Sequence, residues 1–313
     1  MKIVFFATPD IAIESFKYFI NSKEYEVCAL VTQPPKPSNR GKKIVQSKIK
    51  TIALENGIDV IEPHRISKEP ENIEKLKKYC SDFFITFAFG QILSREVIDI
   101  PEYGTINLHA SLLPYYRGAN PICEVLLNGE KKTGITTMKT ALELDAGDIC
   151  LQEEIILDED INTPELMQKI SSMSPVLLDK TLKGLFEGSL KPVPQEHKKA
   201  TFTKKIKKED KNIDWQLPAK KIHDKIRAMH TINTCHTKFG GKLVKILKTK
   251  PLNCTQNAKC GEVLSVDKNG ICVKCGEGAL IILSVKPEGK NEMSAYNWSL
   301  GAKIKTGDMF EIC

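Results

Sequence analysis

Residues 2–20, KIVFFATPDIAIESFKYFI, decide the fold because they contain a strand, a turn and a helix in succession. The apolar run Lys2–Ala7 has the length and composition of a fully buried strand. The turn Thr8-Pro9-Asp10 ends that run, and from residue 10 to residue 20 the apolar side chains recur at helical spacing. Because strands and helices continue to alternate over the first two-thirds of the chain, we predict an α/β fold: a Rossmann-like, doubly wound, mostly parallel sheet with helices on both faces.

The elements expected around this unit follow from the same two periods. Strands are expected at residues 25–32, 83–87, 104–108, 134–140 and 149–157, and helices at 48–55, 71–78 and 122–127. A long helix is expected at 164–186, with Thr163 as its N-cap and Pro164 in its first position. Pro175 is expected to kink this helix or to split it in two.

The last third of the chain has a different pattern. Residues 190–208 are rich in Pro and Lys and have no sustained apolar period, which is typical of a linker. After a helix expected near 218–229, short strands are expected at 243–248, 261–266, 271–273 and 280–285. Turn signals such as Asp267-Lys268-Asn269-Gly270 separate them, and this spacing predicts a small β-barrel or a meander. Of the two, we expect a small OB-like β-barrel.

Length and composition are those of a two-domain globular protein, with 313 residues, 41% of them hydrophobic and 27% charged. No apolar run approaches the roughly 18 residues that cross a bilayer. The N-terminal apolar run is too short for a signal peptide. We therefore expect a soluble protein of the cytoplasm.

The ten cysteines are expected to be reduced thiols, because the chain is long and shows no export signal. Cys272 and Cys275, with Cys254 and Cys260 upstream, resemble part of a zinc site. The wider spacing of the first pair and the lack of a nearby histidine favour incidental cysteines over this alternative. We expect no metal.

Charge is unevenly distributed around the net value of +7: residues 1–196 hold 23 basic and 28 acidic side chains (net −5), and residues 197–313 hold 23 and 11 (net +12). The acidic part contains one basic stretch, 33–50, with no acidic residue and with Lys36, Arg40, Lys42, Lys43, Lys48 and Lys50. Two basic regions favour a polyanion such as RNA bound by both parts. A merely solvated lysine-rich surface is the alternative that charge alone leaves open.

The first strand is not followed by a glycine-rich loop, since Ala7-Thr8-Pro9-Asp10 contains no glycine, and the chain has no P-loop. The sequence therefore argues against NAD or ATP binding in the usual way.

The polar residues that suit chemistry occur in residues 104–121, GTINLHASLLPYYRGANP. Asn107 and His109 lie two apart on a strand and therefore share a face, at the carboxyl end where open α/β sheets bind ligands. The turn LDAGD at 144–148, between two expected strands, supplies a third polar group. An imidazole can accept a proton, a carboxylate can orient it, and a carboxamide can donate to a developing oxyanion, which suits acyl transfer to a substrate amine. The alternative is that both strand residues are structural.

These two segments, 107–118 and 144–148, resemble the 10-formyltetrahydrofolate-dependent formyltransferase family. Residues 33–34 leading to 40–43, and residues 89–93, 211–215, 286–290 and 293–295, resemble the branch of that family that formylates methionyl-tRNA. The similarity covers essentially the whole chain. Two positions depart from the family pattern: Ala7 replaces a usual glycine, and no Pro-Trp pair follows Arg227-Ala228.

The resemblance implies that the α-amine of methionyl-initiator tRNA attacks the formyl carbon of 10-formyltetrahydrofolate. His109 would assist removal of the amine proton, Asp145 would orient His109, and Asn107 would bind the formyl oxygen. The residues implied in folate binding are Gly90, Gln91, Ile92, Leu93, Ser111, Leu112, Leu113 and Pro114. Those implied in tRNA binding are Arg40, Lys42, Lys43, Lys204, Lys205, Lys207 and Lys208.

The expected organisation is a catalytic domain at 1–189, a basic linker at 190–209 and a tRNA-binding β-barrel domain at 210–313, acting as a monomer in translation initiation. One rival is a formyltransferase acting on a nucleotide-sugar amine, which has no use for the basic stretch 33–50. A second rival, of another class, is a non-catalytic RNA-binding protein, and the intact set of Asn107, His109 and Asp145 argues against it.

Overall fold

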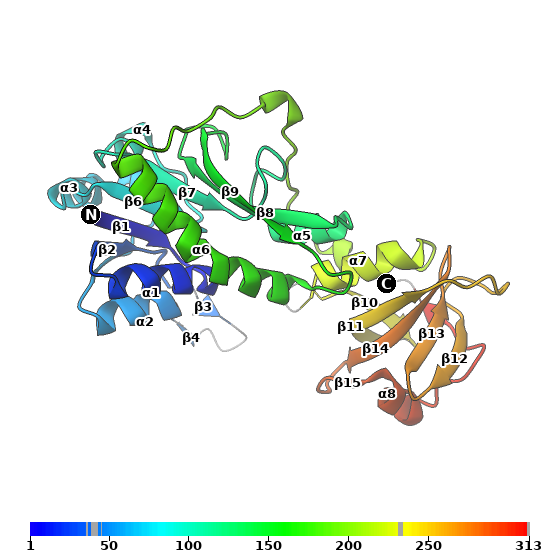
Figure 1. Cartoon of the computed structure of the whole chain (residues 1–313). Helices are drawn as coiled ribbons and strands as arrows, with labels where there is room; N and C mark the ends of the chain where they lie inside the picture. Colours follow the sequence, from blue (N-terminus) through cyan, green and yellow to red (C-terminus); the bar gives the residue numbers. More distant parts are fainter. Residues whose placement is uncertain (36, 39–42, 45, 231–233, 312–313) are drawn as a thin grey trace. The chain divides into compact units, whose positions relative to one another are not determined.

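The structure is a computed structural model that describes all residues except 36, 39–42, 45, 231–233 and 312–313 (Figure 1). The chain divides into two compact units. Unit 1 comprises Met1–Pro121, Lys132–Ile156 and Met167–Thr203. Unit 2 comprises Ile122–Lys131, Leu157–Leu166 and Lys204–Cys313. Each unit contains one large sheet.

The sheet of unit 1 has seven strands and is mostly parallel. Its strands in spatial order are β5 (Asp59–Ile61), β2 (Glu26–Val31), β1 (Lys2–Ala7), β6 (Phe83–Phe87), β7 (Thr105–His109), β8 (Lys132–Lys139) and β9 (Ile149–Ile156). The pairs from β5 to β7 are parallel, whereas β8 is antiparallel to both β7 and β9. The Rossmann-like α/β prediction is confirmed, with an antiparallel edge that the strand pattern did not specify.

Side chains on both sides of β1 are buried because helices cover both faces of this sheet. Phe5 points to one face, where its ring packs against Phe16 and Phe19 of α1 (Ile13–Asn21). Val4 and Phe6 point to the other face, into a buried cluster shared with α3 (Pro70–Lys78) and α4 (Arg95–Ile98). Residues two apart on a strand share a face, so one apolar run serves two layers.

The long helix α6 (Thr163–Phe186) is one helix that contains Pro175, so the predicted split does not occur. The predicted N-cap is also wrong by one residue. Asn162 Oδ1 accepts from the Glu165 backbone N at 3.1 Å, and Glu165 Oε2 accepts from the Asn162 N at 3.0 Å. This reciprocal pair is a capping box, which places Asn162 at the N-cap and Thr163 inside the helix.

The remaining elements of unit 1 are short. They are the 3₁₀ turns at Asp10–Ala12, Ile66–Lys68 and His197–Lys199, the helix α2 (Lys48–Glu55), and a two-stranded pair of β3 (Pro37–Ser38) and β4 (Lys43–Ile44). Residues 190–203 have no helix beyond the 3₁₀ turn, and they are hydrogen-bonded to the rest of unit 1. Val193 exchanges backbone hydrogen bonds with Ile149, and Gln195 is buried.

The sheet of unit 2 is antiparallel and curls into a barrel-like form. Its order is β12 (Val263–Asp267), β13 (Gly270–Lys274), β14 (Ala279–Pro287), β11 (Lys242–Leu252), β10 (His236–Phe239) and β16 (Phe310–Glu311), with β15 (Met293–Ser294) pairing with β14. Backbone hydrogen bonds between residues 261–263 and 307–310 connect the two ends of this order. The predicted β-barrel is therefore confirmed, and the hairpin at Asp267–Gly270 forms as expected.

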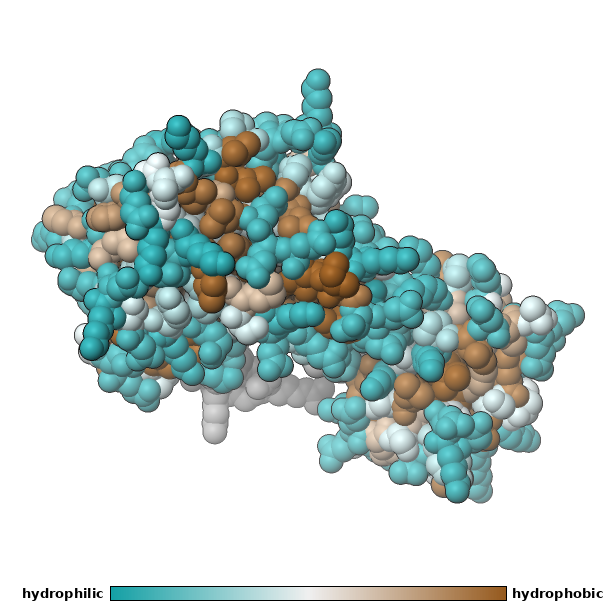
Figure 2. All heavy atoms as spheres, in the orientation of Figure 1, coloured by the Kyte–Doolittle hydropathy of each residue, from teal (hydrophilic) through white to brown (hydrophobic). Residues whose placement is uncertain are grey.

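Unit 2 also contains the helices α5 (Pro121–Leu127), α7 (Ala219–Ala228) and α8 (Ala295–Ala302), and a 3₁₀ turn at Glu209–Lys211. Its core includes Trp215, Trp298 and Phe310. The ring of Phe310 contacts those of Trp215 and Trp298 and that of the half-buried Phe239. On the face drawn in Figure 2 hydrophilic residues predominate and hydrophobic ones form small groups. Among the described residues, no helix combines the length and the hydropathy needed to span a membrane.

Candidate active site

The strand β7 carries Asn107 and His109 at its carboxyl end, where the parallel part of the sheet meets the antiparallel strand β8. Asn107 lies opposite Thr86 of β6, and His109 lies opposite Thr136 of β8. His109 is 6% exposed, and Asn107 is half-buried. In open α/β sheets this edge is where ligands bind, because the loops that follow neighbouring strands meet there.

The carboxamide of Asn107 is held by the neighbouring strand. Thr86 Oγ1 donates to Asn107 Oδ1 at 2.7 Å. Because this bond uses the amide oxygen, it points the Nδ2 hydrogens away from Thr86. The amide is thereby presented as a donor.

The imidazole of His109 contacts an acceptor at each ring nitrogen. Nε2 lies 2.9 Å from the backbone carbonyl oxygen of Tyr116, and Nδ1 lies 3.5 Å from Asp145 Oδ2. The second distance is an ion-pair contact at the outer limit of a hydrogen bond. A neutral imidazole donates from only one nitrogen, so only an imidazolium satisfies both acceptors. Contacts of this kind often tighten when substrate binds.

Asp145 reaches the site from a tight turn between β8 and β9. Its backbone has φ = 50°, in the left-handed region that a non-glycine residue enters at a cost of about 1–2 kcal/mol. Its Oδ2 accepts from the Gly118 backbone N at 2.7 Å. Gly118 itself has φ = 113°, and a Cβ there would lie 2.6 Å from Thr203 Oγ1, so glycine is required for this approach. The structure thus brings Asn107, His109 and Asp145 together on unit 1.

The first group of predicted folate residues follows β6 in a strained turn, where Ala88 and Gly90 both have positive φ. Gln91 uses its side chain to hold the turn: Oε1 accepts from Ile66 N, and Nε2 donates to the Pro63 carbonyl oxygen. The two apolar members have opposite environments. Ile92 is 84% exposed, whereas Leu93 is buried in the core shared with α3 and α4.

The second group follows β7. Ser111 is buried, and its Oγ donates to the Tyr115 carbonyl oxygen at 2.7 Å. Leu113 is buried and its backbone is bound on both sides, by Thr136 Oγ1 and by Gln152 Nε2. Leu112 and Pro114 are half-buried. The two folate groups therefore lie on loops that follow adjacent strands at the same edge as His109.

The described tRNA-binding candidates belong to both units. Arg40 and Lys42 lie outside the described residues, and Lys43 lies on β4. Lys204, Lys205, Lys207 and Lys208 are exposed on unit 2. Two further lysines of the basic stretch are paired with acids of other elements: Lys48 lies 2.5 Å from Asp10 Oδ2, and Lys50 lies 2.7 Å from Glu62 Oε2. The stretch therefore carries less unpaired charge than its sequence indicates.

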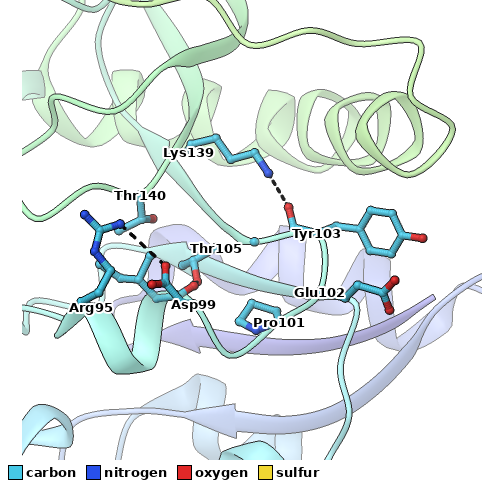
Figure 3. A pocket seen from close by; sticks show the side chains of 10 residues that line it. Arg95, Asp99, Pro101, Glu102, Tyr103, Thr105, Lys139 and Thr140 are labelled. Carbon is cyan, nitrogen blue, oxygen red and sulfur yellow. Dashed lines mark hydrogen bonds and ion pairs between the residues drawn. The ribbon is translucent and has the colours of Figure 1, made fainter.

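A pocket of about 330 Å³ opens beside the first residues of β7, at the end of that strand away from His109 (Figure 3). Arg95, Asp99 and Lys139 line it, and the Lys139 Nζ donates to the Tyr103 carbonyl oxygen. Burial lowers the pKa of Lys139. This pocket lies at the end of β7 opposite to His109, so we do not assign the reaction to it.

In the described part of the chain, no group of three or more His, Cys, Asp or Glu side chains is arranged to hold a metal ion. The nine described cysteines are free thiols. Burial raises the pKa of Cys275 to about 12, which keeps this thiol protonated.

Three site features lie outside the sequence prediction. Thr86 was detectable as the single polar residue of the strand FFITF at 83–87. Arg117 lies within the quoted segment but carried no assigned role. Gln195 had no signal, because it lies in the stretch predicted as a linker. Ala7, which departs from the family pattern, is a fully buried strand residue and is absent from the positive-φ residues, so alanine fits there.

Comparison with known proteins identifies relatives over nearly the whole chain. The sequence model for formyl transferase matches residues 1–182, and that for formyl transferase, C-terminal domain, matches residues 205–303. A methionyl-tRNA formyltransferase of Clostridium botulinum (strain Alaska E43 / Type E3) is 46% identical over 291 residues, which cover 93% of each chain.

Two solved structures share the fold. The sugar 3N-formyl transferase WlaRD, in the presence of dTDP and 5-N-formyl-THF, has a TM-score of 0.65 at 19% identity over 93% of this chain and 99% of its own. A methionyl-tRNA formyltransferase from Clostridium thermocellum has a TM-score of 0.56 at 19% identity over 83% of this chain and 95% of its own. Together with the matches in sequence, these findings show that the chain belongs to the formyltransferase family, in the group of the methionyl-tRNA formyltransferases.

Proposed function

We propose that this protein transfers the formyl group of 10-formyltetrahydrofolate to the α-amine of methionyl-initiator tRNA, as the first step that commits this tRNA to translation initiation. The observation that carries the proposal is the sequence similarity to a methionyl-tRNA formyltransferase through both parts of the chain. The chemistry of the β7 edge is consistent with it, because acyl transfer needs a base and an oxyanion donor.

The proposed reaction begins when the methionyl amine attacks the formyl carbon. The new C–N bond forms as the C=O electrons move onto the formyl oxygen, and the Nδ2–H of Asn107 donates to that oxyanion. His109 accepts the proton that the amine loses, and the Asp145 carboxylate stabilises the resulting imidazolium. When the bond from the formyl carbon to N10 breaks, the same proton passes to N10, and tetrahydrofolate leaves.

His109 can act as a base only after one contact changes. Its Nε2 is occupied by the Tyr116 carbonyl oxygen, whereas Nδ1 faces Asp145. We propose that the substrate amine takes the place of the carbonyl oxygen at Nε2 while Asp145 keeps Nδ1. The base then lies between the carboxylate that orients it and the amine that it deprotonates.

Substrate contacts are proposed from the loops at this edge and from the basic residues. Folate binding is proposed for Gly90, Gln91, Ile92, Leu93, Ser111, Leu112, Leu113 and Pro114. Of these, Ile92 offers the largest exposed apolar side chain for a pterin ring or its linker. Binding of tRNA phosphates is proposed for Arg40, Lys42, Lys43, Lys204, Lys205, Lys207 and Lys208.

The proposed arrangement has a catalytic domain at residues 1–189, a basic linker at 190–209 and a tRNA-binding domain at 210–313. We propose that the protein acts as a monomer in the cytoplasm, where charged tRNA and reduced folate are both present. The nine cysteines in the described part of the chain are free thiols, which is compatible with that compartment.

A competition assay tests the function. The protein is offered radiolabelled 10-formyltetrahydrofolate with charged initiator tRNA and an amino-sugar nucleotide in the same reaction. We expect label on the methionyl-tRNA alone. Label on the sugar alone would replace the proposal by sugar N-formylation, and label on neither acceptor would contradict both.

A further inference from the structure

Unit 1 buries one complete guanidinium beside the proposed active site. Arg117 is 1% exposed and follows the loop whose Tyr116 carbonyl contacts His109. Removing a charge from water costs several kcal/mol even after relaxation, so a buried arginine needs well-placed partners. Among the described residues, the one carboxylate that pairs with its guanidinium belongs to the exposed Glu143, at 3.9 Å. The closer side-chain partners of the guanidinium are Gln195 and His197, whose Nδ1 lies 3.2 Å from Arg117 Nη2.

The main partner is the amide of Gln195, which is itself 5% exposed. Gln195 Oε1 accepts from Arg117 Nη2 at 2.7 Å and from Nε at 3.2 Å. Gln195 Nε2 donates to the carbonyl oxygens of Asp145 at 2.9 Å and Gly147 at 2.7 Å. The orientation of this amide is unambiguous, because arginine can only donate and the two carbonyls can only accept.

The two carbonyls belong to the backbone of the turn that carries the Asp145 carboxylate. The strained φ of Asp145 means that the turn has to be held in place by its surroundings. On its other side Gly147 packs so closely that a Cβ would lie 1.7 Å from the Lys139 carbonyl oxygen. The turn is therefore fixed between β8 and the amide of Gln195.

We propose that Gln195 is a positioning residue for catalysis: held in one orientation by Arg117, it fixes the backbone of the 143–148 turn so that Asp145 stays in contact with His109. This inference rests on the proposed roles of His109 and Asp145. The amide touches neither of those side chains and acts through the backbone of the turn. A displacement of the order of 1 Å at such a turn is enough to cost up to about 100-fold in rate.

The test substitutes Gln195→Glu, which keeps the size of the side chain and the acceptor for Arg117 but replaces the donor by an oxygen facing two carbonyls. At saturating 10-formyltetrahydrofolate and methionyl-initiator tRNA we expect kcat to fall between about 10- and 100-fold, with both KM values changed by less than about threefold. Thermal stability is expected to hold, because Arg117 gains an ionic partner. Gln195→Met, which loses both sets of bonds, is expected to show the same kcat loss.

Glu143→Gln is the matched control, since it removes an exposed carboxylate from the same turn and leaves the bonds of Gln195 intact. We expect wild-type kcat for this variant.

The decisive measurement is a double-mutant cycle with Asp145→Ala. If Gln195 acts through Asp145, adding Gln195→Glu to Asp145→Ala costs no further rate. The positioning role of Gln195 would be overturned, with the catalytic set left intact, by either of two results. One is a double variant in which the kcat losses of the two single variants multiply; the other is a normal kcat for Gln195→Glu when Asp145→Ala is impaired. A normal kcat for Asp145→Ala would overturn the proposed catalytic set and this inference with it.

Discussion

His109 can serve either as a base or as an imidazolium, depending on its two neighbours. Asp145 lies at Nδ1 and the carbonyl oxygen of Tyr116 lies at Nε2, the position that we propose the substrate amine takes. In the proposed reaction the nucleophile is the methionyl amine of the substrate. The chemistry of the site therefore depends on which hydrogen bonds each polar group has already used.

Thr86 decides the orientation of the Asn107 amide, and this can be tested with two substitutions. Thr86→Val keeps the shape but removes the hydroxyl that donates to Oδ1, so the amide is free to turn its oxygen towards the formyl oxygen. We expect kcat for formyl transfer to fall about three- to tenfold, the value of one lost hydrogen bond. Thr86→Ser keeps the donor and is expected to retain wild-type kcat. Equal rates for the two variants would show that Thr86 does not orient the amide.

Among single residues, the sequence predicted those site residues whose spacing or motif can be recognised in the sequence. Asn107 and His109 could be paired from their spacing on a strand, and the family resemblance supplied Asp145. Gln195 could not be found in this way, because its partners are backbone carbonyls about 50 residues away in the chain. A contact with a carbonyl leaves no signature in the sequence of either partner.

The helix α7 of unit 2 contains several buried polar side chains. His223, Asp224 and Arg227 are all buried on it. Asp224 Oδ1 accepts from Arg227 Nε at 2.8 Å and pairs with Lys220 at 3.1 Å. His223 lies between Thr249, at 3.0 Å from Nδ1, and the Glu159 carbonyl oxygen, at 3.4 Å from Nε2. These side chains are fixed by hydrogen bonds and not by apolar packing.

Burial lowers the pKa of His223, even though Asp160 and Asp224 oppose the shift. In the pH range between this lowered value and the ordinary value near 6.5, the unfolded chain binds more protons than the folded one, so stability falls as the pH falls. We expect the midpoint of thermal unfolding to drop between pH 7.5 and 5.5, and to drop less in His223→Gln, which does not titrate. A parallel drop in both proteins would contradict this assignment.

Long, strongly periodic elements were predicted well, and the short ones were not. β10, β15 and β16 span only two to four residues, too few for a period to show, and their positions follow from pairing with distant strands. The cap of α6 was misplaced by one residue because Asn162 and Thr163 are both good N-caps, and only the reciprocal bond with Glu165 distinguishes them.

The whole molecule combines an acidic first part with a basic second part, and the basic stretch 33–50 is the exception in the first. Lys48 and Lys50 of that stretch pair with carboxylates of their own unit. Net charge read from sequence therefore overstates the charge available to RNA. We expect the salt dependence to change most for candidates other than these two paired lysines.

Replacing Arg40, Lys42 and Lys43 together by Ser is expected to weaken tRNA binding and to flatten its salt dependence. Each phosphate contact that is lost lowers the slope of log K against log [salt] by about 0.7–0.9. Lys48→Ser is the control, because its ammonium is already paired with Asp10, and its slope is expected to match that of the wild type. An unchanged slope in the triple variant would show that these residues do not touch phosphates.

The account depends most on His109 as the base that deprotonates the methionyl amine. The most direct test is the single-turnover rate of formyl transfer to methionyl-initiator tRNA by His109→Ala, measured beside the tRNA affinity of the same protein. We predict a rate lower by about 10²–10⁴ with tRNA affinity close to that of the wild type. A His109→Ala protein that formylates methionyl-tRNA at the wild-type rate would contradict the account.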